Sequence, residues 1–255
     1  MRTRLSTQAF DEWNKLNDQA YSLIEKKDYD RATGIVQEAL KIAEQDAAES
    51  MLLAQSMSQL GEIYAFQGKF RQAESIIKRT LDMLDNLNGG NSPIAAICLA
   101  NLGMMNKHQN NFDDAIAYFK VALEIFVGVD GKNHPLVANT LDNLADAYSS
   151  QGYYDEAEPC IIAAVQIREQ IYGQQHPEIA TNLNDLAICY FMRGQYGQAE
   201  SLFQQALMIW EKTTGASHQH FVDCLENLAS LYRKTNRLKL AAEYENRAAI
   251  ILRQI

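Results

Sequence analysis

The chain repeats itself with a period of 42 residues, and this period limits the folds that it can adopt. Six alanines follow one another at intervals of 41 or 42 residues: Ala32, Ala73, Ala115, Ala157, Ala199 and Ala241. Five leucines lie thirteen residues before the last five of these alanines: Leu60, Leu102, Leu144, Leu186 and Leu228. Self-similarity at such a period is typical of a solenoid, in which each supersecondary unit packs on copies of itself.

Each period has the pattern of two amphipathic helices. In the fourth period, Leu141, Leu144 and Tyr148 have the spacing of one helix face, and Gly152 lies where a helix C-cap is expected. A second helix, predicted to run to about Tyr172, follows with its own apolar stripe of Ala157, Ile161, Ala164 and Ile167.

Small residues are predicted where the two helices of a period approach most closely. Ala145 and Ala157 are such residues, and Gly61 and Gly103 occupy the place of Ala145 in the second and third periods. A larger side chain at these positions would force the helices apart.

Composition favours a folded chain and excludes some partners. Hydrophobic residues are 47% and charged residues 22% of the 255, and the formal net charge is −9. We therefore expect neither nucleic acid nor an anionic membrane surface as a partner. There is no run of 18 apolar residues and no apolar segment behind the first arginines, so we expect no membrane span, no secretory signal and a cytoplasmic location. The four cysteines form no CxxC pair and are predicted to be free, buried thiols.

Three motifs carry a family resemblance. The best matches are Asn143-Leu-Ala-Asp-Ala-Tyr148, Gly152-Tyr-Tyr-Asp-Glu-Ala-Glu158 and Gly173-Gln-Gln-His-Pro177. Each unit resembles a tetratricopeptide repeat, and the 42-residue variant is similar to the repeats of kinesin light chains. The resemblance implies an all-α fold: a right-handed α-solenoid of about six helical hairpins, with about 12 helices. We expect one domain over residues 11–255 after an extension at 1–10, with repeats at approximately 11–45, 52–88, 93–130, 135–172, 177–214 and 219–255.

The two ends of the repeat array differ from its middle. In the first period Gln19 replaces the leucine and Lys27 replaces the glycine, so we interpret this unit as an N-terminal cap. The last helix, from about Leu238 to Ile255, is expected to leave an apolar stripe without a following repeat. That stripe is Ala241, Tyr244, Ala248, Ile251 and Leu252.

No catalytic motif is present, and we expect neither enzymatic activity nor a cofactor. The sequence has no GxxxxGK[ST], GxSxG or HExxH pattern. His134, His176 and His218 are 42 residues apart, but equivalent residues of stacked hairpins are roughly 10 Å apart and cannot share one metal ion. We interpret these histidines as parts of the turns between repeats and expect no metal site.

The residue before each periodic leucine has no obvious structural role. These pre-leucine positions hold Gln59, Asn101, Asn143, Asp185 and Asn227. Asparagine is a poor residue for a helix interior, so these side chains either bond to the backbone of a neighbouring helix or contact a ligand. In the resembled family the first helix of each repeat lines a concave groove, and asparagines there bond to the backbone of a bound peptide. A carboxamide offers the donor and the acceptor that such a backbone needs.

Helical geometry adds further candidates on the same face, one turn to either side. With the pre-leucine residues, the predicted peptide-binding set includes Asn139, Asp142, Asp146, Asn184, Met104, Ile188, Phe191, Glu226 and Arg233. Asp142 and Asp146 could in principle support acid–base or metal chemistry, but we interpret them as part of an acidic wall. The acidic middle and its apolar residues suit a peptide with a neutral or basic stretch and an apolar anchor.

The sequence therefore predicts a non-enzymatic scaffold that binds a peptide segment of a partner protein in the groove. An alternative is a module for homo-oligomeric assembly, with a homodimer formed through residues 238–255. A third possibility is a regulator that senses a signalling peptide, although no effector domain is evident.

Overall fold

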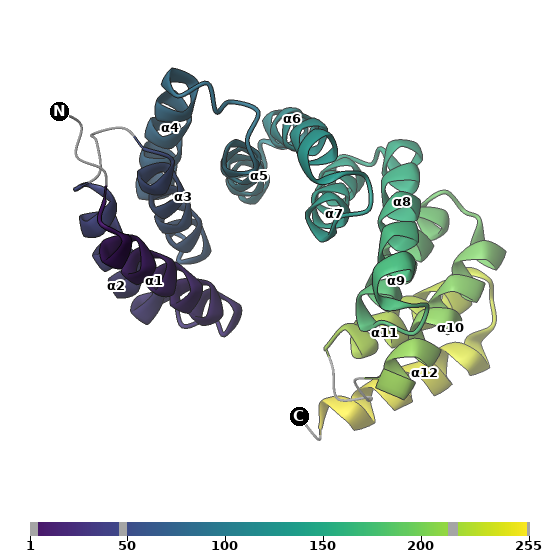
Figure 1. Ribbon diagram of the computed structural model, residues 1–255. Coiled ribbons are helices and arrows are strands. Elements are labelled where there is room, and N and C mark those ends of the chain that lie inside the picture. Colours follow the sequence, from purple (N-terminus) through teal and green to yellow (C-terminus); the bar gives the residue numbers. More distant parts are fainter. Residues whose placement is uncertain (1–4, 46–49, 214–218, 254–255) are drawn as a thin grey trace. The chain divides into compact units, whose positions relative to one another are not determined.

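The computed structural model describes residues 5–45, 50–213 and 219–253. Within these ranges the chain forms twelve helices and no strand, which confirms the predicted all-α fold (Figure 1). The helices divide between two compact units, residues Met1–Val129 and Asp130–Ile255. None of the helices in the described ranges is long and apolar enough to cross a membrane.

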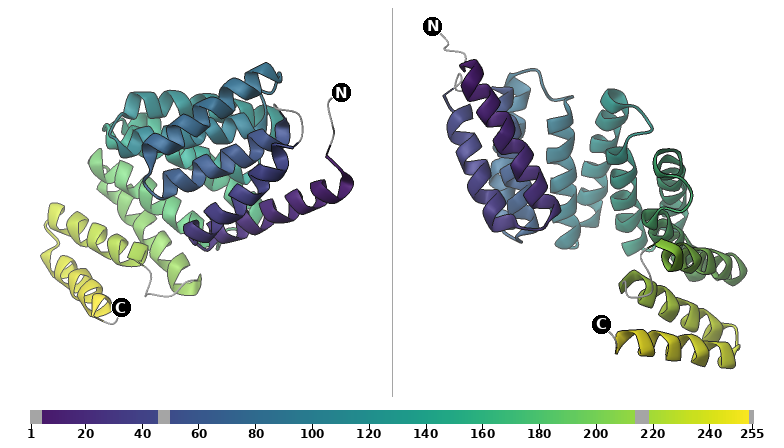
Figure 2. Two further views of the ribbon diagram at one scale, coloured as in Figure 1. Left: turned by 90° about the vertical axis from the view of Figure 1, so that its left-hand side faces the viewer. Right: turned by 60° about the horizontal axis from the view of Figure 1, so that its bottom comes forward.

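Unit 1 contains three helical hairpins. Their helices are α1 (Thr7–Glu25), α2 (Tyr29–Ala43), α3 (Met51–Phe66), α4 (Phe70–Asn86), α5 (Pro93–His108) and α6 (Phe112–Asp130). Helix α1 packs against α2 and α3 against α4, while Phe119 of α6 lies against Gly103 of α5. Helix α2 also contacts α3, and α4 contacts α5. Figure 2 shows the first two hairpins side by side. Helix α1 begins inside the segment 1–10 that the sequence suggested as an extension.

Unit 2 contains the other three hairpins. Its helices are α7 (Pro135–Ser150), α8 (Tyr154–Tyr172), α9 (Pro177–Met192), α10 (Tyr196–Thr213), α11 (Gln219–Lys234) and α12 (Leu238–Leu252). Helix α8 packs against both α7 and α9, and α10 against both α9 and α11. Within unit 2, the second helix of a hairpin therefore also packs against the first helix of the next hairpin, as the solenoid pattern predicts.

The turn within a hairpin requires one residue in the left-handed region. Gly152 has φ = 81° and follows α7, and its amide donates to the carbonyl of Ser149. Glycine takes this conformation without a steric penalty from Cβ. Lys27, which replaces the glycine in the first hairpin, has the same conformation with φ = 59°.

Side chains cap the first helices of several hairpins. Ser50 and Ser92 accept hydrogen bonds from the amides of Leu53 and Ala95. His134 and His176 do the same through Nδ1, from an extended backbone that precedes a proline at the first helical position. This confirms their interpretation as turn residues, whereas His218 lies outside the described residues.

The predicted close approach of the paired helices is confirmed at the two glycines. A Cβ atom on Gly61 would lie 2.6 Å from Ile77 Cγ1, and one on Gly103 would lie 2.7 Å from Phe119 Cε1. Ala145 occupies the equivalent place in the α7–α8 hairpin, and both Ala145 and Ala157 are buried. Small residues are therefore needed there because the partner helix occupies the space.

One polar contact recurs with the sequence period in unit 2. Tyr190 Oη on α9 donates to Glu158 Oε1 on α8 at 2.6 Å. Forty-two residues later, Tyr232 Oη on α11 donates to Glu200 Oε1 on α10 at 2.9 Å. Each bond links the first helix of one hairpin to the second helix of the hairpin before it.

The expectation for the last helix is partly wrong. Ala241, Ala248 and Ile251 are buried in the core of unit 2 because α12 turns this stripe towards α11. Among the apolar side chains that α12 exposes, Leu252 belongs to the predicted stripe, whereas Leu238, Leu240 and Ile250 lie outside it.

The four cysteines are free thiols, as predicted. Cys98, Cys189 and Cys224 are buried, but Cys160 is only half-buried, contrary to the expectation that all four would be buried.

Candidate functional site

The pre-leucine residues lie in the middle of the first helices of the second to sixth hairpins. Gln59 is on α3, Asn101 on α5, Asn143 on α7, Asp185 on α9 and Asn227 on α11. Their environments differ, even though they share one place in the period. Gln59 and Asn101 are buried, Asn143 and Asn227 are half-buried, and Asp185 is exposed.

Two buried amides of unit 1 lack hydrogen-bond partners. Gln59 is only 2% exposed, and neither its Oε1 nor its Nε2 makes a hydrogen bond. Asn101 is 8% exposed, and its Nδ2 is also unpaired. Burial raises the pKa of the Tyr21 phenol, and the side chain of Gln59 acts in the opposite direction. Each unpaired amide costs about 1–3 kcal/mol in desolvation.

The amides of unit 2 are bonded within the protein. Asn143 Nδ2 donates to the carbonyl of Asn139, one turn earlier on α7, at 3.1 Å. Asn227 Nδ2 lies 3.4 Å from Asn184 Oδ1, which connects α11 to α9. These contacts match the local structural role that the sequence left open, whereas the amides of unit 1 do not.

Most other predicted site residues contact the protein core or a neighbouring helix. Met104, Ile188 and Phe191 are half-buried and pack against the core clusters of their units. Arg233 forms an ion pair with Glu245 of α12, and Glu226 is exposed on α11.

A buried arginine organises the predicted residues at the start of α7. The guanidinium of Arg168, on α8, lies among α7, α8 and α9 with its side chain 5% exposed. Its Nη2 donates to Asn139 Oδ1 at 2.8 Å and lies 2.7 Å from Asp142 Oδ2. Its Nε donates to Glu178 Oε2 at 2.7 Å. Asn139 and Asp142 are therefore joined through Arg168.

The network is closed by Asn182 of α9. Arg168 Nη1 donates to Asn182 Oδ1 at 3.0 Å, and Asn182 Nδ2 donates to Asp142 Oδ1 at 2.6 Å. Removal from water opposes the charge on Arg168, but Asp142 and Glu178 outweigh this effect and its pKa stays above the ordinary value. Burial raises the pKa of Asp142, while Arg168 and Asn182 act in the opposite direction. The two carboxylates accordingly face a permanent positive charge.

Sequence reasoning did not find Arg168, although a signal was present. Arg168 follows Ala164 by four residues and Ile161 by seven, so it stands on the predicted apolar stripe of the second helix. A charged residue on a buried stripe needs oppositely charged partners. This position therefore predicts an ion-pair network.

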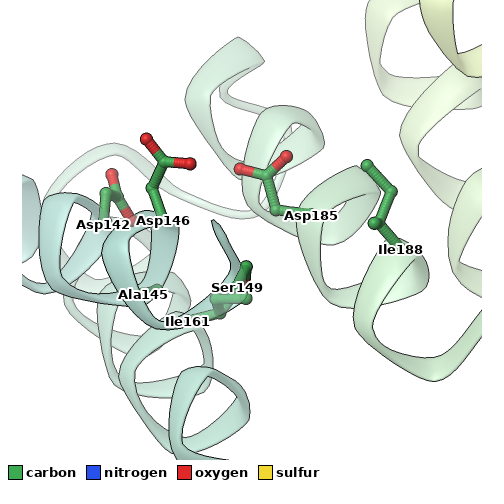
Figure 3. A pocket seen from close by; sticks show the side chains of 7 residues that line it. All are labelled: Asp142, Ala145, Asp146, Ser149, Ile161, Asp185 and Ile188. Atoms are coloured by element: carbon green, nitrogen blue, oxygen red, sulfur yellow. The ribbon is translucent and has the colours of Figure 1, made fainter. Parts of the chain in front are cut away.

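A cavity of about 170 Å³ lies beside this network in unit 2. It is lined by Asp142, Ala145, Asp146, Ser149, Ile161, Asp185 and Ile188. Figure 3 shows the carboxylates of Asp146, from α7, and Asp185, from α9, pointing towards each other. Three carboxylates of the predicted peptide-binding set, Asp142, Asp146 and Asp185, are thus brought together at one cavity.

Asp185 carries the most perturbed carboxyl of this cavity. The surrounding protein removes part of its hydration, and the negative charges of Asp142 and Asp146 add repulsion, so its pKa is raised to about 7. The Asn184 amide, whose Nδ2 donates to Asp185 Oδ1 at 3.3 Å, acts in the opposite direction. In unit 1, burial similarly raises the pKa of Glu62, one turn after Ser58, to about 7.

The acidic residues of the cavity do not form a metal site. Among the described residues, no three histidine, cysteine, aspartate or glutamate side chains converge closely enough to hold a metal ion.

Comparison with known proteins places the chain in a family. The model described as Tetratricopeptide repeat matches residues 14–86, 72–126, 96–158, 136–212 and 194–254. No curated protein sequence matches the chain.

Several solved structures have a similar fold. Similarity to BtubC (BKLC) from P. vanneervenii has a TM-score of 0.70 at 18% identity and covers 98% of this chain and 92% of that chain. A second similar structure is that of nearly identical TPR-like repeats from a protein of Podosopora anserina designated as a kinesin light chain. Its TM-score is 0.66 at 20% identity, and the match covers 77% of this chain and 92% of that chain. A Rap protein complexed with Competence and Sporulation Factor matches with a TM-score of 0.64 at 15% identity. This match covers 95% of this chain and 75% of that chain.

At these identities the solved structures show the fold alone, a tetratricopeptide solenoid. The family matches, in contrast, follow the sequence itself and overlap from residue 14 to residue 254. The chain belongs to the tetratricopeptide repeat family.

Proposed function

We propose that this protein is a non-enzymatic interaction scaffold that binds an extended peptide segment of a partner protein on the helix faces that carry the pre-leucine residues. The tetratricopeptide fold is consistent with a protein–protein interaction scaffold. The free thiols are consistent with a reducing compartment, and we propose a cytoplasmic location.

The unpaired amides of Gln59 and Asn101 carry this proposal. Both side chains are buried on successive first helices of unit 1, and within the described residues both polar atoms of Gln59 and the Nδ2 of Asn101 make no hydrogen bond. A fold gains nothing from such amides, since an apolar side chain of the same size would avoid the desolvation cost. The backbone of an extended peptide supplies both a carbonyl and an N–H, which are the groups that a carboxamide needs.

Binding on preformed helices limits the entropy that the complex loses. The amides are carried by α3 and α5, which pack against each other and against α4. Only side-chain rotations of Gln59 and Asn101, and the ordering of the peptide, are required to form the new hydrogen bonds.

The experiment that tests this proposal uses apolar replacements of equal size. A random peptide library displayed on phage is selected on the wild-type protein, and the affinity of the best peptide is measured for a Gln59→Met/Asn101→Leu variant. We expect the variant to bind about tenfold or more weakly, because two hydrogen bonds are lost. Its thermal stability should be equal to or higher than that of the wild type, because two unpaired buried amides are removed.

The matched control changes the same residue types on a second helix. Gln72→Met/Asn86→Leu alters two exposed residues of α4 and should leave the affinity unchanged. Undiminished affinity of the Gln59→Met/Asn101→Leu variant would refute the role of these amides. The absence of any selected peptide would refute peptide binding.

A second candidate function is homo-oligomeric assembly through residues 238–255. The observation that favours it is the exposed apolar surface of α12, where Leu238 is 61% and Ile250 is 55% exposed. Light scattering over a range of concentrations tests it, with Ile250→Glu as the disrupting variant. A mass that stays monomeric at every concentration would exclude this assembly.

Sensing of a signalling peptide is a special case of the first proposal. The Rap protein with the same fold is described in complex with Competence and Sporulation Factor. A regulator of that kind would bind its peptide through the same amides, so the display experiment covers it.

A further inference from the structure

The cavity between α7, α8 and α9 has two chemically different parts. Ala145, Ile161 and Ile188 supply aliphatic surface, and the carboxylates of Asp146 and Asp185 point towards each other from α7 and α9 (Figure 3). Its volume, about 170 Å³, gives room for one side chain rather than for a folded element. A ligand that fills it must therefore be apolar along its length and polar at its end.

The positive charge of the nearby Arg168 is already paired with carboxylates. Its guanidinium bonds to Glu178, Asn182 and Asn139 and pairs with Asp142. Asp142 in turn uses one oxygen for Arg168 and the other for Asn182. The network thus satisfies itself and leaves no positive charge for the far side of the cavity.

Asp185 faces the cavity without such compensation. Its hydrogen-bond donor is the neutral Asn184 amide, and no basic side chain in the described parts of the chain forms an ion pair with it. Asp142 and Asp146 repel its charge. A cation placed between α7 and α9 would relieve this repulsion.

The kind of cation follows from the geometry of the lining. The carboxylates do not converge into a set of metal ligands, so a bare metal ion does not match them. Arginine and lysine combine an aliphatic stem with a charged end, which matches the aliphatic surface and the carboxylates. The planar guanidinium can bond to two carboxylates at once and is therefore the better of the two.

We propose that this cavity of unit 2 is a specificity pocket for an arginine or lysine side chain of a peptide that binds this unit, with Asp185 as its principal counter-ion. The stem packs on Ala145, Ile161 and Ile188, and the charged end lies between Asp146 and Asp185. This inference rests on the proposed peptide-binding function and adds which residue the peptide must contain.

The test uses a small probe, so that it does not depend on an unknown partner. Nα-acetyl-L-arginine amide is titrated into protein labelled with ¹³C at the isoleucine δ1 methyl groups, at constant ionic strength. Ile161 and Ile188 line the cavity and report its occupation. Nα-acetyl-L-citrulline amide has the same shape without the charge and serves as the matched ligand.

Two variants complete the design. Asp185→Asn removes the charge while keeping the shape, and Glu243→Gln removes a charge from an exposed residue of α12. We expect the arginine probe to shift both methyl resonances in the wild type and in Glu243→Gln. Citrulline amide, and the arginine probe with Asp185→Asn, should bind about tenfold more weakly, because a charge-assisted contact is lost.

Equal responses to arginine and citrulline amides, no response to either, or an unchanged response in Asp185→Asn would overturn the proposal. These results are distinguishable from failure of the proposed function. If selected peptides depend on Gln59 and Asn101 but contain no basic residue and ignore Asp185→Asn, peptide binding stands and the pocket assignment falls.

Discussion

Arg168 of α8 and Asp142 of α7 form an ion pair, with 2.7 Å between Nη2 and Oδ2, inside a network that also ties α9 to both helices through Glu178 and Asn182. Asp142 also lines the cavity that contains Asp185. Structural support and the proposed binding pocket therefore share one carboxylate.

Replacement of Arg168 by methionine should destabilise unit 2 by roughly 3 kcal/mol, because two carboxylates lose the buried charge that they face. Urea unfolding followed by circular dichroism measures the effect. Arg31→Met is the matched control, since Arg31 is 78% exposed and its pair with Asp28 contributes little. A loss no larger than that of the control would contradict a structural role for the network.

Asp185→Asn should stabilise the protein in a pH-dependent manner. Because the folded-state pKa of Asp185, about 7, lies above its ordinary value of 3.8, the folded protein binds more protons than the unfolded chain between these values. The ionised carboxyl therefore costs stability as the pH rises from about 4 to about 7. The difference in Tm between Asp185→Asn and wild type should be near zero below pH 4 and greatest above pH 7. A difference that does not change with pH would be inconsistent with the raised pKa.

Two glycine-to-alanine variants should have opposite effects. Gly103→Ala places a methyl group within 2.7 Å of the buried Phe119 ring and should destabilise by about 1–3 kcal/mol. Gly34→Ala meets nothing within 4 Å in the middle of α2, and should stabilise by about 0.5–1 kcal/mol because alanine is the better helix former. Thermal unfolding of both variants tests whether the close approach, rather than the helical position, makes Gly103 necessary.

Lys27→Gly should stabilise the first hairpin by roughly 0.5 kcal/mol. Lys27 has φ = 59°, a conformation that costs a residue with a Cβ atom more than it costs glycine, although glycine loses more entropy on folding. Lys26→Gly is the control, since Lys26 has φ = −80° and gains nothing from the change. Hydrogen exchange of the α1 and α2 amides would reveal the local effect, and equal protection in the two variants would contradict it.

The fold could be predicted from the sequence because its determinants are local and repeated. Gly152 correctly marked the turn between α7 and α8, and the second helix ends at Tyr172 as predicted. Gly61 and Gly103 likewise marked close helix contacts, because glycine in a helix is unfavourable unless packing requires it.

The details of the candidate site could be predicted less well. Gln59 and Asn143 occupy the same place in the period, yet Asn143 bonds to the carbonyl of Asn139 while Gln59 has no hydrogen bond. The sequence period determines the position of a residue on its helix, but the conformation of its side chain depends on the residues of adjacent helices. Arg168 was missed for a related reason, since its partners come from α7 and α9 and are not adjacent to it in the sequence.

The most direct test of the central claim observes the two amides while a peptide binds. The side-chain NH₂ groups of Gln59 and Asn101 give assignable ¹⁵N resonances, which are followed while a peptide selected on the wild-type protein is added. New hydrogen bonds predict that both resonances shift and that their protons exchange more slowly with water. If the peptide saturates the protein and both amides keep their shifts and exchange rates, the peptide binds elsewhere and the account is wrong.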